Sequence, residues 1–422
     1  MRLPFRLSIS ILSLGLFLAV GANASGQDSP LPEARPDSVG FSVERLKRLD
    51  QSLQALVDGK QLAGLVTLVA RHGQLVQQKT YGQQDIAGAK PMQGDTIFRI
   101  YSMTKPITGV AMMILFEEGK WKPSDPISKH IPEFASLKVF CGLDDSGNLK
   151  LEAPTHAPTM GELMSHTAGF TYGFFGNTPV DKAYRDAGPF QAASLKEFID
   201  RVAKLPLAYQ PGEAWIYSLS GDIEGYLVEK LSGKPFPEFV RERIFAPLGM
   251  KDTHFFLPME KRDRFAAVYG SDADGKAVRQ PEGQKGQGHY VDGPRKSFSG
   301  GAGLISTARD YATFLEALRN GGALGKVRIL SPHAVELMTT NQVGKLRGET
   351  ANGFGYGFET HDRYGVSGME SVGSWGWGGA YGTYYRVDPE ARLTTVFMIQ
   401  LAPNNTDFKD KFTAAVYQAL LQ

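Results

Sequence analysis

The sequence has a single cysteine, Cys141, among its 422 residues. One cysteine cannot form a disulfide within the chain, so no internal crosslink stabilises the fold. The stability must come from a buried core. A chain of this length, 42% of it hydrophobic, is large enough to build one.

Outside its first 24 residues the sequence has no apolar run long enough to cross a bilayer. Within them, Arg2 and Arg6 precede an apolar run over residues 7–20, and Ala22-Asn23-Ala24 follows. This order is typical of a secretory signal peptide with a small-residue cleavage site. An uncleaved anchor is the alternative, but the run is short and contains serines. We therefore expect residues 1–24 to be removed, no stable membrane anchor, and a periplasmic or secreted mature protein.

The mature chain lacks an excess of either charge. Cleavage removes two of the 46 basic side chains and none of the 44 acidic ones, which leaves 44 of each. A neutral chain has no overall field that would attract nucleic acid or anionic lipid. We therefore expect a small-molecule partner and no nucleic acid. The sequence carries no signal for an oligomeric state.

Two kinds of hydrolase motif are also missing. There is no G-x-S-x-G element, which marks the nucleophile of many serine hydrolases. The eight histidines form no short cluster such as H-x-H or H-E-x-x-H. We therefore expect neither a metal nor another cofactor.

Strand patterns gather at the two ends of the chain, whereas helical patterns and long loops fill the middle. The helical patterns cover residues 41–56, 195–205, 222–231, 307–318 and 408–421, and the strand patterns cover 64–70, 74–82, 96–100 and 382–401. The turn Arg71-His72-Gly73 predicts a hairpin, and Thr307 with Asp310 predicts a capping box. Loop 270–294 is polar and rich in glycine, and its role is open.

These patterns predict the α+β class, with an antiparallel sheet flanked by helices. After a polar tether over residues 25–37, one domain spans 38–422. Its α/β part combines residues 38–116 and 295–422, and residues 117–294 form an inserted helical subdomain.

The stretch IYSMTKPITG, residues 100–109, places Ser102 one helical turn before Lys105. Pro106 is tolerated only in the first turn of a helix, so the helix must begin at or just before Ser102. Residues three apart share a face, which brings the lysine within reach of the serine hydroxyl. A serine becomes a good nucleophile when a neighbouring base takes its proton, and a desolvated lysine can act as that base. A helix that merely contains both residues is the alternative.

Two further segments add to this pattern. PGEAWIYSLSGDIEG places Tyr217 in a loop just before a helix, where a phenol can share the proton relay, although it can equally be a core residue. SWGWGGAYGTYY places Trp377-Gly378-Gly379 at the start of a strand. Glycines there allow a close approach, so the strand edge can offer an N–H to an oxyanion, although a bulge or turn explains them too.

Together these segments resemble the serine β-lactamase/penicillin-binding superfamily, and most closely its class C branch and the family VIII carboxylesterases. Further matching segments are MGELMSHTAGF, IFAPLGMKDTHF, GGAGLISTARDYATFL and VDPEARLTTVFM, so the resemblance extends from about residue 38 to the C-terminus. It implies Ser102 as nucleophile, Lys105 as its partner and Tyr217 as a base in the relay. It also implies an oxyanion hole formed by the N–H groups of Ser102 and Ala380. The fold that it implies agrees with the pattern above.

The sequence departs from lactamases at two positions. Leu219 replaces the asparagine of Y-x-N, and Trp377 replaces the lysine of K-T-G, in a Trp377-Gly378-Gly379 element that resembles the family VIII esterases. A charge-assisted hydrogen bond contributes about 1.5–3 kcal/mol, and a lactam carboxylate would lose that contact at Trp377. A neutral ester does not need it.

Three aromatic residues, Tyr172, Phe174 and Phe175, are candidates for an aromatic substrate pocket. His166, in the SHTAGF element, resembles a structural turn of the family. We therefore expect it to be structural, because the lysine and tyrosine already supply a base.

These features predict an exported serine hydrolase that cleaves small carboxylic esters through an acyl-enzyme on Ser102, with acyl transfer to another alcohol as a related reaction. A β-lactamase or D-amino-acid peptidase is the alternative within the class. A non-catalytic cell-wall-binding protein of the same fold is the alternative from another class.

Overall fold

The computed structural model describes residues 31–283, 286–291, 297–349 and 352–421. The expected signal peptide lies outside these residues, as does the first part of the expected tether. The later part of that tether packs on the domain: the Leu31 side chain is fully buried, and Glu33 bridges to Leu75. No helix in the described ranges is long and apolar enough to span a membrane.

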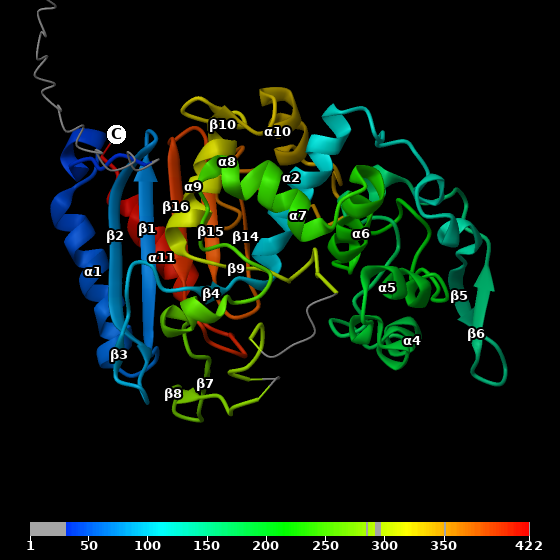
Figure 1. Cartoon of the computed structure of the whole chain (residues 1–422), viewed down its shortest axis with the longest axis horizontal. Helices are drawn as coiled ribbons and strands as arrows, with labels where there is room; N and C mark the ends of the chain where they lie inside the picture. Colours follow the sequence, from blue (N-terminus) through cyan, green and yellow to red (C-terminus); the bar gives the residue numbers. More distant parts are fainter. Residues whose placement is uncertain (1–30, 284–285, 292–296, 350–351, 422) are drawn as a thin grey trace, which may run out of the picture.

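An antiparallel sheet forms the centre of the left half of the molecule in Figure 1. Its strands, in spatial order, are β12 (Gly353–Phe354), β13 (Glu359–Thr360), β14 (Trp375–Gly378), β15 (Tyr384–Asp388), β16 (Leu393–Met398), β1 (Gly64–Arg71), β2 (Gln74–Asp85) and β3 (Lys90–Pro91). β1, from the start of the chain, pairs with β16, from its end. The α+β class and the sheet built from both ends of the chain are therefore confirmed.

Alternation along β1 explains why the sheet carries helices on both faces. Leu65 and Val69 join the core beneath α1 (Val43–Asp58) and α11 (Phe408–Gln418). Leu68, pointing the other way, joins the larger core that α9 (Ala308–Arg319) and α2 (Thr104–Glu117) complete. The hairpin between β1 and β2 is confirmed, with His72 and Gly73 at φ of 55° and 77°.

Helices and loops to the right of the sheet in Figure 1 form the helical side of the molecule. They comprise α3 (Met160–Met164), α4 (Pro179–Ala187), α5 (Leu195–Val202), α6 (Ser220–Ser232) and α7 (Phe236–Val240), with the hairpin of β5 (Val139–Leu143) and β6 (Leu149–Glu152). The short α8 (Ala246–Leu248) follows α7 and lies over the sheet in this view. α10 (Pro332–Thr339) and the pair β10 (Ala323–Leu324) and β11 (Val327–Arg328) lie at the top. The exact bounds of the inserted subdomain stay a prediction.

The segment that contains β7 (Tyr269–Ser271) and β8 (Ala277–Arg279) packs against the sheet side of the molecule. Phe265 bridges to Ile97, and Tyr269 bridges to Leu401. Loop 270–294 thus includes a two-stranded sheet, and two parts of it lie outside the described residues.

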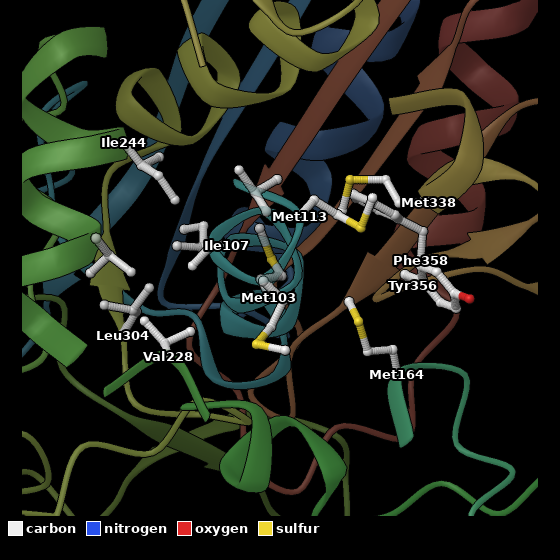
Figure 2. Close-up of a cluster of buried hydrophobic side chains, with 14 of the residues drawn as sticks. Met103, Ile107, Met113, Met164, Val228, Ile244, Leu304, Met338, Tyr356 and Phe358 are labelled. Carbon is white, nitrogen blue, oxygen red and sulfur yellow. The ribbon is translucent and has the colours of Figure 1, made fainter. Parts of the chain in front are cut away.

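α2 lies between the sheet and the helical side, and it is apolar around its whole circumference, as expected of a helix buried on all sides. Figure 2 shows Met103, Ile107 and Met113 surrounded by side chains from several other elements. The helix that carries the candidate lysine is therefore held from every direction, so its first turn is a rigid platform.

Candidate active site

The chain reaches the candidate nucleophile through β4 (Phe98–Arg99), which pairs with β9 (Ile305–Ser306). Ser102 then lies in a short 3-10 turn over Tyr101–Met103, directly before α2. Tyr101 has φ of 42°, in the left-handed region that non-glycine residues rarely adopt and that costs about 1–3 kcal/mol. Pro106 is the third residue of α2 and lies in its first turn, as its missing N–H requires.

Lys105 is almost completely buried, at 2% exposure. Its Nζ lies 3.4 Å from Ser102 Oγ, 2.8 Å from Tyr172 OH and 2.8 Å from the Gly301 carbonyl oxygen. An ammonium has three donors, and each one has an acceptor here. The predicted contact between the serine and the lysine is therefore present.

Tyr217 faces the same lysine in a different way. Lys105 Nζ lies 4.5 Å from the centre of the Tyr217 ring, and the Tyr217 hydroxyl accepts a hydrogen bond from Trp377 Nε1 at 3.3 Å. Tyr217 precedes α6, as predicted. The phenol that bonds Lys105 directly is that of Tyr172, which the sequence placed only in the pocket. Its partner lies 67 residues away along the chain, so no local motif could reveal the contact.

Burial raises the pKa of the Tyr172 phenol well above its ordinary value. Tyr172 is therefore a neutral phenol that accepts from Lys105 and keeps its own proton. Tyr172 and Tyr217 also pack on each other, with ring centres 5.3 Å apart. The lysine thus lies against two tyrosines.

Two backbone N–H groups near the serine are candidates for an oxyanion hole. In the described chain, neither the Ser102 N–H nor the Ala380 N–H donates a hydrogen bond to the protein. Gly379, next to Ala380, lies against the backbone just before the serine, since a Cβ built on it would be 2.4 Å from the Ile100 carbonyl oxygen. The structure therefore brings both predicted oxyanion donors to one region.

Trp377 and Gly378 form the end of β14, and Gly379 follows it, so the prediction that this element begins a strand was wrong. The reason is that β14 pairs with β15 over residues 375–378, before the glycines turn the chain. The Trp377 indole is half-buried and packs on the Tyr217 ring, with ring centres 5.4 Å apart. Leu219 caps the start of α6, and its side chain is fully buried in the core rather than open to a ligand.

An exposed aromatic patch, formed by Phe174, Phe175 and Phe190, lies beside the two tyrosines. The exposed fractions of these three side chains are 57%, 67% and 44%. Phe175 lies 5.5 Å from Tyr217 between ring centres, and Phe190 lies 5.8 Å from Tyr172. Exposed apolar side chains that adjoin reactive groups are typical of a ligand site.

His166 is 3% exposed, and its Nδ1 accepts a hydrogen bond from the Ser218 N–H at 3.2 Å. Burial lowers its pKa well below the ordinary value, so the ring is neutral. It packs on the Tyr217 ring, with ring centres 5.2 Å apart. This geometry suits a supporting residue.

Comparisons with known proteins identify the family of the chain. The family model described as Beta-lactamase matches residues 49–420. The chain belongs to this family. It is a serine hydrolase with the antiparallel-sheet and helix architecture that the family shares.

Among curated proteins, Protein Rv1367c of Mycobacterium tuberculosis is 33% identical over 84% of this chain and 89% of its own length. Esterase EstB of Burkholderia gladioli is 29% identical over 87% of this chain and 94% of its own. Among solved structures, EstCE1, described as a hydrolase with promiscuous acyltransferase activity, has a TM-score of 0.73 and 26% identity. The match covers 88% of this chain and 98% of that one.

Proposed function

We propose that the protein cleaves small carboxylic esters through an acyl-enzyme on Ser102, with acyl transfer to a second alcohol as a related reaction. The observation that carries this proposal is the position of Trp377. A neutral indole bonded to Tyr217 stands where lactamases carry a lysine, so the site has no cation there for a substrate carboxylate. The similarity to EstB and EstCE1 supports an ester substrate.

The reaction begins when Ser102 Oγ attacks the ester carbonyl carbon. Lys105 in its neutral form takes the hydroxyl proton, since its Nζ lies 3.4 Å from Oγ. The N–H groups of Ser102 and Ala380 stabilise the oxyanion that develops on the carbonyl oxygen. The ester C–O bond then breaks, and the proton passes from the lysine and tyrosine group to the leaving alkoxide.

The acyl group now sits on Ser102 and awaits a second nucleophile. A water molecule gives hydrolysis, and a second alcohol gives acyl transfer, because the same base accepts a proton from either. The aromatic patch of Phe174, Phe175 and Phe190 supports the apolar part of the substrate, and its exposure suits ligands that enter from solvent.

The deciding experiment compares kcat/KM for short p-nitrophenyl esters with kcat/KM for nitrocefin. We expect the esters to be the better substrates. If nitrocefin is better by tenfold or more, the protein is a β-lactamase or a related peptidase instead. If neither substrate is turned over and a fluorophosphonate fails to label Ser102, the non-catalytic cell-wall-binding alternative holds.

Export is a separate proposal, supported by the sequence of residues 1–24 alone. We expect the mature protein to begin at Ser25 in the periplasm or the medium. Mass spectrometry of the purified N-terminus tests this, and an intact Met1 in the exported fraction would contradict it.

A further inference from the structure

A buried carboxylate lies near Lys105 and interacts with it electrostatically. Asp222 belongs to the first turn of α6, which packs beside α2 (Figure 1), and its side chain is 2% exposed. The reaction proposed above does not use it. A buried carboxylate costs stability unless its surroundings compensate it.

Hydrogen bonds connect this carboxylate to the lysine in an unbroken chain. Lys105 Nζ donates to the Gly301 carbonyl oxygen at 2.8 Å. The same peptide unit presents the Ala302 N–H, which donates to Ser299 Oγ at 2.9 Å. The Ser299 hydroxyl in turn donates to Asp222 Oδ1 at 2.5 Å.

Every donor in this chain points from the lysine toward the carboxylate. Hydrogen bonds aligned in this way polarise one another in a low-dielectric interior. The charge on Asp222 therefore makes the Gly301 oxygen a stronger acceptor for Lys105. A second hydrogen bond, from the Gly301 N–H to Asp222 Oδ1 at 3.3 Å, holds the turn that bears this carbonyl.

Close packing against neighbouring groups holds this turn, residues 300–302, in place. A Cβ built on Gly301 would lie 2.6 Å from Asp222 Oδ2 and 2.8 Å from Tyr172 OH. A Cβ on Gly300 would lie 2.1 Å from the Gly221 carbonyl oxygen. The glycines thus allow the turn to pass close to the backbone of α6 and to the Tyr172 hydroxyl.

The other oxygen of this carboxylate, Asp222 Oδ2, is buried and has no hydrogen-bond partner in the described chain. A carboxylate needed only for packing would be expected to bond through both oxygens. Asp222 is thus a buried carboxylate in which Oδ1 accepts hydrogen bonds and Oδ2 accepts none from the described residues.

We propose that Asp222 is a positioning residue that acts on Lys105 through a hydrogen-bond chain across Ser299. The hydrogen-bond chain directs one N–H of the neutral lysine to Gly301 and leaves the second for Tyr172, so that the nitrogen lone pair faces the Ser102 hydroxyl. Asp222 touches no reacting atom. This inference rests on the proposed function of Ser102 and Lys105.

The test compares variants that break the hydrogen-bond chain from Lys105 to Asp222 with variants that leave it intact. Ser299→Ala removes the middle link and leaves every charge in place, whereas Ser299→Thr keeps a hydroxyl. Asp222→Asn removes the charge at the end of the chain. Glu224→Gln is the matched control. Glu224 is a buried acid on the same helix, and burial together with the charges of Lys105 and Asp222 shifts its pKa, but Glu224 is not part of the hydrogen-bond chain.

We expect Ser299→Ala to lower kcat for a p-nitrophenyl ester about tenfold with little change in KM, since one hydrogen bond contributes free energy of that size. The rate at which a fluorophosphonate labels Ser102 should fall in parallel. Ser299→Thr should restore most of both rates. The double variant of Ser299→Ala with Asp222→Asn should lose little more than the worse single variant, because both changes break one chain.

The proposal is overturned if Ser299→Ala keeps wild-type kcat and labelling rate, or if the two losses simply add. It is also overturned if Glu224→Gln lowers kcat as much as Ser299→Ala, since any polar change in this buried region would then have the same effect. If Asp222→Asn does not fold, the comparison of Ser299→Ala with Ser299→Thr and Glu224→Gln still decides the question. Failure of the proposed function gives a different result, namely full activity in Ser102→Ala.

Discussion

A methyl group at Gly379 should separate the two oxyanion donors. A Cβ at this position would lie 2.4 Å from the Ile100 carbonyl oxygen and 2.3 Å from Thr383 Oγ1. The threonine side chain can rotate, but the Ile100 carbonyl belongs to the backbone two residues before Ser102. The variant Gly379→Ala must therefore push the end of β14, and with it Ala380, away from the nucleophile.

The size of the effect follows from two terms. Overpacking of this kind costs about 1–3 kcal/mol of stability, which a chain with this core tolerates. Loss of one oxyanion donor typically lowers kcat by about 10²–10³-fold. Because the donor is displaced rather than removed, we expect Gly379→Ala to lower kcat for a p-nitrophenyl ester by at least about tenfold, with a smaller change in KM.

The neighbouring glycine supplies the control. A Cβ on Gly378 would meet the Thr383 carbonyl oxygen at 3.3 Å and Tyr384 Cδ2 at 3.5 Å, so Gly378→Ala should fold and keep a kcat near that of the wild type. Circular dichroism and thermal melting must show both variants folded. Wild-type kcat in folded Gly379→Ala would refute the assignment of Ala380 to the oxyanion hole.

Three further outcomes are expected. Tyr217→Phe should lower kcat more than His166→Ala does in any variant that still folds, since general bases contribute about 10²–10⁴-fold; the reverse ranking, with normal circular dichroism for both, would favour a histidine relay. Leu219→Asn combined with Trp377→Lys should shift the ratio of kcat/KM values from p-nitrophenyl esters toward nitrocefin, and an unchanged ratio would show that these positions do not set the preference. Burial raises the pKa of Glu224 to about 8, so the folded state favours the protonated acid and loses stability relative to the unfolded state as pH rises from 4.5 toward 8. Urea unfolding of Glu224→Gln should show a flatter pH dependence over that window, and an unchanged slope would exclude this residue as its source.

Local rules predicted the parts of the fold that neighbouring residues determine. Pro106 predicted a helix start at or just before Ser102; a 3-10 turn begins there at Tyr101, and α2 itself begins at Thr104. His72-Gly73 indicated the first hairpin. The capping box at Thr307 was half correct: Thr307 accepts from the Asp310 N–H, but the Asp310 carboxylate bonds to Thr253 and the Asp252 N–H instead. The hydrogen bonds from Thr253 and the Asp252 N–H replace the local bond that Asp310 would make in a capping box.

The same distinction between local and tertiary contacts applies to the candidate site. The contact between Ser102 and Lys105 was predictable, because one helical turn creates it. The bond from Lys105 to Tyr172 and the chain to Asp222 were not, since they join segments 67 to 196 residues apart. Such contacts depend on how α2, α6 and the turn around Gly301 pack, and no periodicity in the sequence encodes that packing.

Covalent labelling is the most direct test of whether Ser102 carries the acyl group. The protein is treated with a fluorophosphonate and, separately, quenched during turnover of a p-nitrophenyl ester, and the peptides are then mapped by mass spectrometry. We expect one phosphonyl or acyl adduct per chain, on Ser102, and neither adduct in folded Ser102→Ala. An adduct on another residue, or ester turnover that persists in Ser102→Ala, would contradict it.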